Sequence, residues 1–372
     1  MHVRVLMISK AYVMGIYQRK LEEIASLGVD LTVVVPPFWR DERGDLMLER
    51  AHTDGYALRV LPIALNGSFH LHYYPRLGRI FGEVGPDIVH IDEEAYNLAT
   101  VQAVGLSRRC GAHPLFFTWQ NLYRRYPPPF CWGEQYVYRR VGAAVAGNHD
   151  AVRVLRAKGY AGPVRVIPQF GVDPALYGCA SLPARAPFTI GYIGRLVPEK
   201  GVDDLLRAVA GLGGSWELRL LGHGPMRDAL SGLARELGIE NRVHLDPQLS
   251  SSLVPDYLCR LHALVLPSRT QENWKEQFGR VLVEAMVSGI PVVGSSSGEI
   301  PNVIGEAGLV YPEGDVPALR DRLEALMADP ALWGRLSERC RARALAHFTQ
   351  AQVAAETVDL YHEMMGSADR DL

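Results

Sequence analysis

The 372-residue chain lacks the features of a membrane-spanning, secreted or nucleic-acid-coating protein. It has no apolar run near the roughly 20 residues that cross a bilayer. Its first residues have neither the apolar length nor the small-residue cleavage site of a signal peptide. Its 39 basic and 41 acidic residues nearly cancel, so we expect no nucleic-acid partner. These absences predict a folded, cytoplasmic protein.

Cysteine and lysine are scarce. The five cysteines are scattered, without a Cys-x-x-Cys pair, at Cys110, Cys131, Cys179, Cys259 and Cys340. An odd, dispersed set is typical neither of a disulfide framework nor of a zinc site, and it suits a reducing compartment. Only five of the 39 basic residues are lysine, so a lysine within a motif is more informative than an arginine.

Short apolar runs alternate with amphipathic stretches along the chain, which predicts βαβ units on parallel sheets. The predicted fold class is α/β, with two Rossmann-like, doubly wound domains facing across a cleft. We place the first domain at residues 1–175 and the second at residues 186–347. The stretch Gly171–Pro187, with three prolines and little periodicity, is the expected linker.

Individual elements follow from the apolar runs and their stops. We expect strands at Val3–Ile8, Leu31–Val35, Asp87–Ile91, Leu115–Thr118, Ala143–Ala146, Val164–Pro168, Phe188–Ile193, Trp216–Leu221, Val243–Leu245, Ala263–Leu266 and Pro291–Gly294. We expect helices at Gly15–Ser26, Gly201–Gly211, Pro225–Leu237, 280–288 and 331–365, the last broken at Phe348-Thr349. Ligands of such sheets bind in the loops at the carboxyl ends of the strands.

The segment after the strand Ala263–Leu266 is the most informative. A helix starting near Gly279 would direct backbone N–H groups and its positive dipole end at an anion such as a diphosphate. The residues concerned are Phe278, Gly279, Arg280 and Val281. Glu276 lies just before this helix and Glu284 about one turn inside it, and two carboxylates there suit the hydroxyls of a ribose and a sugar. The alternative interpretation is a capping Glu276 and a solvated Glu284.

A second loop carries two cations. Gly194 ends the strand Phe188–Ile193, and Arg195 and Lys200 follow before the next helix. Two cations five residues apart can clamp a diphosphate leaving group. Glu199 offers the alternative of an ordinary surface ion pair.

A third loop carries Gly222 and Gly224 but lacks the last glycine of a dinucleotide fingerprint, which argues against a dehydrogenase. Together the three loops resemble those of glycosyltransferase family 4, the retaining nucleotide-sugar transferases of the GT-B fold. The resemblance covers about residues 188–315, through Gly194-Arg195-Leu196, Lys200-Gly201, Gly222-His223-Gly224-Pro225, Glu276 to Glu284, Gly289-Ile290-Pro291-Val292-Val293 and Gly298-Glu299. The first domain matches more loosely. The helix at 348–366 resembles the family's C-terminal segment, which returns to the first domain.

The resemblance implies a role for each matching residue. Arg195 and Lys200 would neutralise the departing diphosphate, and Glu276 would bind a hydroxyl of the transferred sugar; we class these three as catalytic. Glu284 would bind the ribose hydroxyls. The other donor-binding positions are Phe278, Gly279, Arg280, Val281, Gly194, Gly222 and Gly224.

The first domain departs from the family at two points. Gln120 stands where the family usually has a histidine, two residues after Thr118, so it can hydrogen-bond a sugar but cannot be a general base. The loop after the first strand, which includes Tyr12, keeps only Gly15 where the family often has two glycines. With Tyr126 of a rigid proline-rich loop, these residues are the expected acceptor or sugar side.

The sequence offers no candidate metal ligands at the end of a predicted strand. The only Asp-x-Asp sequence is Asp369-Arg370-Asp371 in the terminal tail. We therefore expect no metal and no cofactor, with a nucleotide-diphosphate sugar as co-substrate. The resemblance implies retention at the anomeric carbon. Because both motif glutamates are assigned to hydroxyls, we hypothesise front-face displacement, in which the departing diphosphate accepts the proton of the incoming hydroxyl.

Residues 107–165 hold ten basic residues against two acidic ones, with aromatic residues interleaved. One interpretation is a surface for an anionic lipid headgroup, a lipid-linked diphosphate or an acidic glycan, with peripheral contact at the inner membrane surface. The other interpretation is that arginine is simply frequent along this chain, and that the aromatic residues belong to the hydrophobic core.

The predicted function is a retaining transfer of a hexose-type sugar from a UDP- or GDP-linked donor to a glycan, lipid-linked or small-molecule hydroxyl. Gln120 and the reduced first loop leave open a non-catalytic GT-B protein that binds nucleotide sugar or glycan. A nucleotide-sugar epimerase is also open, although it needs a base beside the sugar and the sequence shows no obvious one.

Overall fold

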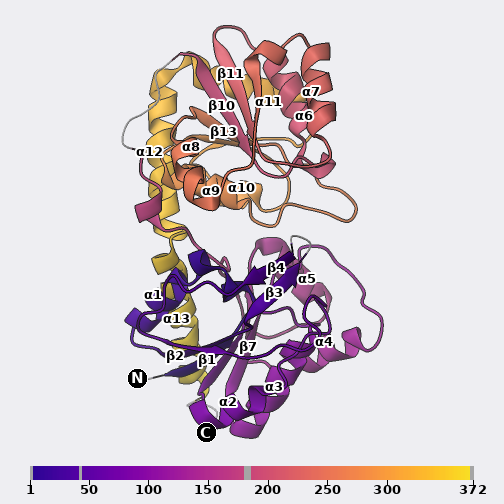
Figure 1. Cartoon of the computed structure of the whole chain (residues 1–372), viewed down its shortest axis with the longest axis vertical. Helices are drawn as coiled ribbons and strands as arrows, with labels where there is room; N and C mark the ends of the chain where they lie inside the picture. The colour runs from indigo at the N-terminus through magenta and orange to yellow at the C-terminus, as the bar shows by residue number, and fades with distance from the viewer. Residues whose placement is uncertain (1–2, 42–43, 180–185, 369–372) are drawn as a thin grey trace. The chain divides into compact units, whose positions relative to one another are not determined.

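The structure is a computed structural model that describes residues 3–41, 44–179 and 186–368. The chain divides into two compact units (Figure 1). The first comprises Met1–Gly171 and Gln350–Leu372, and the second comprises Val172–Thr349. Each unit has its own parallel sheet covered by helices, so the doubly wound α/β prediction is confirmed.

The first unit contains a seven-stranded sheet among its described residues, in the order β5-β2-β1-β6-β7-β8-β9. The strands are β1 (Arg4–Ile8), β2 (Asp30–Val35), β5 (Ala57–Val60), β6 (Ile88–Ile91), β7 (His113–Thr118), β8 (Ala143–Ala146) and β9 (Val164–Val166). The helices are α1 (Arg19–Ser26), α2 (Leu77–Val84), α3 (Leu98–Cys110), α4 (Phe130–Tyr138), α5 (His149–Ala157) and α13 (Gln350–Ala368). A separate antiparallel hairpin joins β3 (Phe38–Asp41) to β4 (Gly44–Met47).

Both faces of this sheet are buried. Successive side chains of a strand point to opposite faces, so Val5 and Met7 of β1 join one core cluster while Leu6 and Ile8 join the other. Helix α13 packs on α1 in the first of these cores, through residues such as Tyr361. Burial on both faces explains why the strands are continuous apolar runs rather than alternating ones.

The second unit contains a six-stranded parallel sheet, in the order β12-β11-β10-β13-β14-β15. Its strands are β10 (Phe188–Ile193), β11 (Trp216–Leu221), β12 (Val243–Asp246), β13 (Ala263–Leu266), β14 (Val292–Ser295) and β15 (Leu309–Tyr311). Its helices are α6 (Val202–Ala210), α7 (Arg227–Glu236), α8 (Val254–Leu258), α9 (Arg280–Val287), α10 (Ile300–Ile304), α11 (Val316–Ala328) and α12 (Pro330–His347).

Two helix starts differ from the prediction. The expected helix at Gly15–Ser26 begins only at Arg19, after the 3-10 turns η1 (Ala11–Val13) and η2 (Gly15–Tyr17). The expected helix at Pro225–Leu237 begins at Arg227, so Pro225 lies before it rather than in its first turn. In both places the chain completes a tight turn before regular helix geometry begins.

The expected linker is partly a packed element of the second unit. Val172 and Tyr177 are buried in its core, and the 3-10 turn η3 (Pro174–Leu176) lies between them. The rest of the predicted linker includes residues 180–185, which lie outside the described residues.

The cysteine prediction is wrong for two of the five residues. Cys179 and Cys259 form a disulfide across 80 residues of sequence. Cys110, Cys131 and Cys340 are free. The spacing gave no signal for this pair, because folding brings the start of the second unit beside α8. The cysteine pattern therefore no longer supports a reducing compartment.

Candidate active site

In the second unit the strand order reverses between β10 and β13, and ligands of open α/β sheets bind at the carboxyl ends of strands at such a point. The loop after β10 includes the 3-10 turn η4 (Pro198–Lys200), and the loop after β13 leads to α9. The backbone joins the loops, since the Arg269 N–H donates to the Glu199 carbonyl at 2.8 Å. The Arg269 side chain also binds Asp203 and Asp204 of α6.

Lys200 and Glu276, one from each loop, are in direct contact. The Lys200 Nζ donates to Glu276 Oε2 at 2.5 Å, and the Ser268 hydroxyl donates to the same oxygen at 2.8 Å. The ammonium also lies 4.8 Å from the centre of the Trp274 ring, a favourable cation–π distance. Glu276 does not cap α9, whose N-cap is Gly279, so the capping interpretation is wrong.

Arg195 is the most exposed of the three predicted catalytic residues, at 58% for its side chain. Its guanidinium lies 3.7 Å from the Glu199 carboxylate, so the alternative ion pair is formed. Exposed pairs of this kind contribute about 1 kcal/mol or less, and the arginine stays able to turn toward an anion. Its carbonyl accepts a hydrogen bond from the Tyr192 hydroxyl at 2.7 Å, which fixes the backbone there.

Glu284 is not a solvated helix-face residue. Its side chain is 14% exposed, and its Oε1 accepts from Arg280 Nε at 2.8 Å, one helical turn away. Burial raises the pKa of the Tyr177 phenol, and the Glu284 charge raises it further. The phenol therefore stays protonated beside the carboxylate.

Gly222 and Gly224 lie where two loops meet backbone to backbone. A Cβ at Gly222 would be 1.9 Å from the Gly194 carbonyl oxygen, and one at Gly224 would be 2.3 Å from that of Leu196. Their φ values of 149° and 155° also disfavour a side chain. These glycines let the loop after β11 press against the loop that carries Arg195.

The start of α9 is the predicted anion-binding position of the second unit. Gly279 is its N-cap with φ of 74°, and the positive end of the helix dipole lies there. The Phe278 ring packs edge-on against Phe348 with centroids 5.8 Å apart, and Val281 packs on the core of the unit. Both side chains are half-buried, and the backbone N–H groups here are the predicted donors to an anion.

Three residues of this site were not predicted from the sequence: Ser268, Trp274 and Tyr177. Ser268 and Trp274 lie within ten residues of Glu276 on the same loop, so their position was a usable signal. Tyr177 gave none, because it lies far from Glu284 in the sequence and reaches it only through tertiary packing.

In the first unit the strand order reverses between β1 and β6, and the residues after β6 are acidic. Asp92, Glu93 and Glu94 are all buried. Lys10, from the loop after β1, forms an ion pair with Glu93. Burial would raise the pKa of Glu93, but Lys10 and His72 together lower it to about 2. This cluster was not predicted from the sequence.

Glu94 connects the cluster to Gln120. Its oxygens accept from the Thr118 hydroxyl at 2.6 Å and from the Trp119 N–H at 2.8 Å. The Gln120 N–H in turn donates to the Thr118 hydroxyl at 3.1 Å. Burial raises the pKa of Glu94 to about 7, although both hydrogen bonds lower it.

Two of the predicted acceptor-side residues lie together. The Gln120 amide donates to the Tyr126 hydroxyl at 3.4 Å, and the Tyr126 ring lies 4.3 Å from that of Tyr96. Both Gln120 and Tyr126 are half-buried, so part of each faces solvent.

Tyr12 and Gly15 have different surroundings. Tyr12 is fully buried and packs edge-on against Phe170, which contradicts a direct contact of its side chain with a sugar. The Gly15 N–H donates to the Glu49 carboxylate at 2.6 Å.

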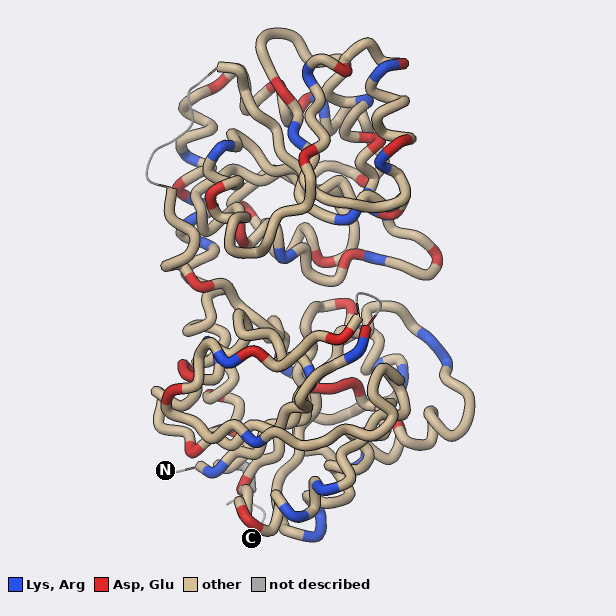
Figure 2. The backbone as a smooth tube through the Cα atoms, in the orientation of Figure 1, with Lys and Arg blue, Asp and Glu red and all other residues tan. Residues whose placement is uncertain are grey.

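The basic segment 107–165 is partly neutralised by local partners. Lys158 is buried against Glu134 at 2.6 Å, and Arg165 pairs with Glu363 of α13. Figure 2 shows acidic and basic residues interspersed over each unit.

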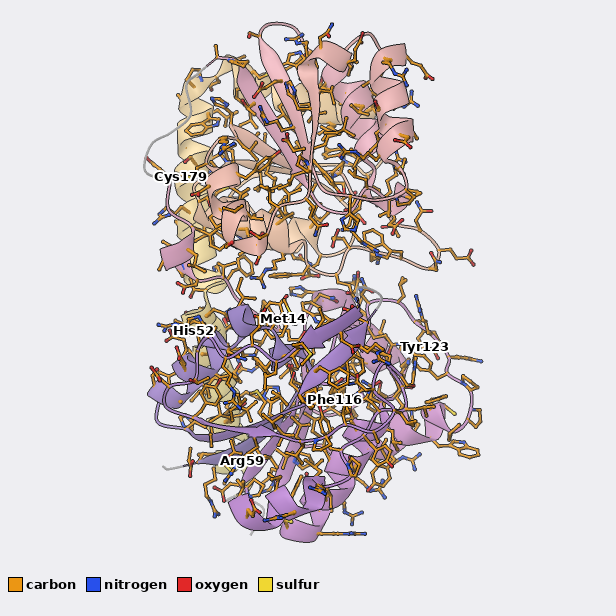
Figure 3. All side chains as sticks on the ribbon, viewed as in Figure 1. Met14, His52, Arg59, Phe116, Tyr123 and Cys179 are labelled. Carbon is orange, nitrogen blue, oxygen red and sulfur yellow. A yellow bond between two sulfur atoms is a disulfide. The ribbon has the colours of Figure 1, made fainter. Side chains whose placement is uncertain are left out.

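Other parts of that segment stay at the surface. Arg108, Arg109 and Tyr136 line a cavity of about 550 Å³ between α3 and α4. Tyr123 is 51% exposed and Trp132 is 68% exposed, whereas Phe116 of β7 is buried (Figure 3). Within the described part of the chain, no helix has the length and apolarity needed to traverse a bilayer.

Two family descriptions match the chain, one in each part. "Glycosyl transferase 4-like domain" matches residues 16–169, and "Glycosyl transferases group 1" matches residues 181–346. The second match contains Lys200, Glu276 and Glu284.

Two named relatives are glycosyltransferases. The alpha-D-kanosaminyltransferase of Streptomyces kanamyceticus is 26% identical over 276 residues, which are 69% of each chain. The MMP alpha-(1->4)-mannosyltransferase of Mycolicibacterium hassiacum is 36% identical over 173 residues, which are 45% of this chain and 41% of that one. The chain thus spans about two thirds of the first relative and less than half of the second.

Solved structures show the same architecture along nearly the whole chain. Sucrose-phosphate synthase from Thermosynechococcus elongatus has a TM-score of 0.72 at 20% identity, covering 98% of this chain and 100% of that one. Anabaena HepE in complex with UDP has a TM-score of 0.72 at 18% identity, with the same coverage. At these identities the likeness shows the fold alone, which is GT-B. With both family descriptions matched in order along this fold, the chain belongs to the group 1, family 4-like glycosyltransferases.

Proposed function

We propose that this protein transfers a hexose from a nucleoside diphosphate sugar to an acceptor hydroxyl, with retention at the anomeric carbon and without a metal. The observation that carries the proposal is the contact between Lys200 and Glu276 at the strand-order reversal of the second unit. The pair places a cation for a diphosphate beside an acceptor for a sugar hydroxyl. Glu284, on the helix that starts at the same loop, supplies the acceptor for a ribose.

The proposed step breaks the bond from the anomeric carbon to the diphosphate oxygen and forms a bond to the acceptor oxygen on the same face. The proton of the acceptor hydroxyl goes to the departing diphosphate. Lys200, Arg195 and the N-terminal end of α9 stabilise the negative charge that develops on that group. The protein thereby contributes mainly positioning and electrostatics.

The proposed acceptor is a glycan, a lipid-linked sugar or a small-molecule hydroxyl, bound by the first unit. Gln120 and Tyr126 supply polar and aromatic contacts there. The exposed Tyr123 and Trp132, and Arg108 and Arg109 at the cavity between α3 and α4, support peripheral contact with an anionic membrane surface as part of this proposal.

Donor binding is tested by calorimetry with UDP, GDP and ADP, each with magnesium and with chelator. UDP comes first because HepE, of the same fold, was crystallised with UDP and with UDP-glucose. We expect one nucleotide to bind equally well without metal, and Glu284→Ala to lose most of that affinity.

The matched control is Glu324→Ala, because Glu324 also pairs with an arginine one turn away, Arg320, but on the surface helix α11. Its nucleotide affinity should equal that of the wild type. If none of the three nucleotides binds, the enzyme proposal fails and a non-catalytic role moves ahead. An inverted anomeric configuration in the product would refute front-face displacement.

A further inference from the structure

The loop after β13 makes a tight turn that returns toward Lys200. The Gln271 N–H donates to the Trp274 carbonyl at 2.7 Å, and the Trp274 N–H donates back to the Gln271 carbonyl at 3.3 Å. Gln271, Glu272 and Asn273 are exposed, whereas Trp274 is half-buried. The turn therefore holds its aromatic side chain against the protein while its tip faces solvent.

Both flanks of this turn are bonded to other loops of the second unit. On one side the Thr270 N–H donates to the Glu313 carboxylate at 2.8 Å, and the hydroxyls of Thr270 and Ser297 lie 3.0 Å apart. On the other side the Glu299 N–H donates to the Glu276 carbonyl at 3.2 Å. Because these partners lie in the segments that follow β14 and β15, the position of the turn is fixed by the sheet.

The Trp274 ring lies beside the ammonium of Lys200. The distance from Lys200 Nζ to the ring centroid is 4.8 Å, within the range of a cation–π interaction. An ammonium has three N–H donors. Glu276 Oε2 accepts from one of them at 2.5 Å, and the ring covers a second side of the group. A diphosphate oxygen would therefore approach Lys200 from the remaining side.

Lys200 depends on the ring more than Glu276 depends on Lys200. Glu276 Oε2 also accepts from the Ser268 hydroxyl at 2.8 Å, so this carboxylate has a second donor. Among the described residues, the recorded partners of the Lys200 ammonium are Glu276 and Trp274. Without the ring, the long lysine side chain regains rotamer freedom, and its one remaining partner is a carboxylate that competes with the diphosphate for the ammonium.

We propose that Trp274 is a positioning residue for Lys200, and that its ring holds the ammonium where it meets the diphosphate of the donor. The inference rests on the proposed role of Lys200 as the cation for that diphosphate. Trp274 acts through Lys200, so it needs no contact of its own with the donor. Its contribution should therefore appear in diphosphate recognition and vanish when Lys200 is removed.

The test measures diphosphate preference, the ratio of the affinities for a nucleoside diphosphate and the matching monophosphate. UDP with UMP, GDP with GMP and ADP with AMP are compared by calorimetry on the full chain, in the presence of chelator. We expect Trp274→Leu to reduce this preference about three- to tenfold, in the range of a part-buried cation–π contact. Trp274→Phe keeps an aromatic face and should retain most of the preference.

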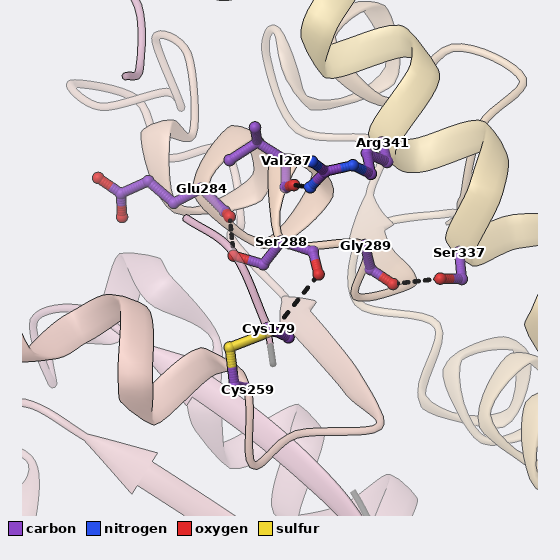
Figure 4. The surroundings of a disulfide bond; sticks show 8 residues. All are labelled: Cys179, Cys259, Glu284, Val287, Ser288, Gly289, Ser337 and Arg341. Carbon is purple, nitrogen blue, oxygen red and sulfur yellow. Dashed lines mark hydrogen bonds between the residues drawn. A yellow bond between two sulfur atoms is a disulfide. The ribbon is translucent and has the colours of Figure 1, made fainter. Parts of the chain in front are cut away.

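The monophosphate is the reference because the ribose part of the site is held separately. The carboxylate proposed for the ribose, Glu284, lies on α9, and the C-terminal end of that helix is bonded to α12. Arg341 donates to the Val287 carbonyl at 2.6 Å, and Ser337 donates to the Gly289 carbonyl at 2.5 Å (Figure 4). These contacts do not involve the turn, so monophosphate affinity should stay at the wild-type value in both Trp274 variants.

Trp333→Leu is the matched control. Trp333 is also a half-buried tryptophan of the second unit, and it donates to the His262 carbonyl at 2.7 Å. Its loss should leave the diphosphate preference unchanged. In a double-mutant cycle, Trp274→Leu should reduce the preference no further once Lys200→Ala is present.

Three results would overturn the inference. The first is an unchanged preference in Trp274→Leu while Lys200→Ala lowers it, which leaves the proposed function standing. The second is a loss in Trp274→Phe as large as that in Trp274→Leu, because the effect would then not follow the aromatic face. The third is a preference that Lys200→Ala itself leaves unchanged, which also removes the proposed role of Lys200.

Discussion

The carboxylates near the strand-order reversal of each sheet have different bonding partners in the two units. Both have a strand-order reversal with acidic residues in the loops beyond it. In the second unit Glu276, which is 8% exposed, and the part-exposed Glu284 are each paired with one cation. In the first unit Glu94, which is 9% exposed, accepts instead from neutral donors, the Thr118 hydroxyl and the Trp119 N–H.

This difference distinguishes carboxylates that are available to bind a ligand from carboxylates that hold the protein backbone in place. A part-exposed carboxylate paired with a cation can exchange its partner for a ligand hydroxyl at small cost. A buried carboxylate is costly to leave unpaired, so it fixes the backbone around it. Glu94 does this for Trp119 and Gln120.

The largest effect is expected from a buried ion pair of the first unit. Glu134→Ala leaves the Lys158 ammonium, whose side chain is 4% exposed, without its carboxylate. We expect the free energy of unfolding to fall by about 3–5 kcal/mol, measured by urea denaturation. Glu363→Ala is the control, because its partner Arg165 is 46% exposed, and it should cost about 1 kcal/mol or less. Equal losses would show that burial does not set the difference.

Lys200→Ala should have the largest effect on turnover in the second unit. It removes the cation beside the departing diphosphate and leaves Glu276 without its ammonium partner. We expect kcat to fall by roughly 100- to 1000-fold, measured as sugar transfer from the donor that binds. Arg207→Ala, on the exposed face of α6, should leave kcat unchanged. A comparable fall in that control would mean that the rate responds to any loss of positive charge.

Gly222→Ala tests the backbone contact between two donor-side loops. The added methyl would lie 1.9 Å from the Gly194 carbonyl oxygen, so one loop has to shift. We expect a loss of about 2 kcal/mol, read by thermal denaturation. Gly232→Ala, in the middle of α7 with nothing within 4 Å of the new methyl, should instead stabilise by about 0.5–1 kcal/mol. Two changes of the same sign would refute the contact.

The smallest effect is the pH dependence that Glu94 contributes. Its pKa of about 7 in the folded protein exceeds its ordinary value of 4.5. Between these values the folded state binds more protons than the unfolded state, so stability falls as pH rises. We expect wild type to lose about 1–2 kcal/mol relative to Glu94→Gln between pH 5 and pH 7. A difference between the two proteins that stays constant over this range would contradict the prediction.

Local sequence patterns predicted many of the strands, and they predicted the loop residues of the second unit. The apolar runs predicted the strands because buried parallel strands need continuous apolar residues, and β8, β10, β11 and β13 agree with the prediction at both ends. The motif spacing placed Lys200 and Glu276 on loops after neighbouring strands, and the parallel topology brought those loops together. Whether these residues act as assigned stays a prediction until the variants are measured.

The tertiary structure alone decided the contacts between residues far apart in sequence. The disulfide of Cys179 with Cys259 and the buried cluster of Lys10 with Glu93 have no local signal in the sequence. Each joins segments that meet only when a sheet assembles. Sequence periodicity reports which face of an element is apolar, whereas burial of a polar group depends on what folds over it. The sequence therefore determined the fold class and the family of this protein, and tertiary packing decided which charged groups are buried and which side chains hold the site in position.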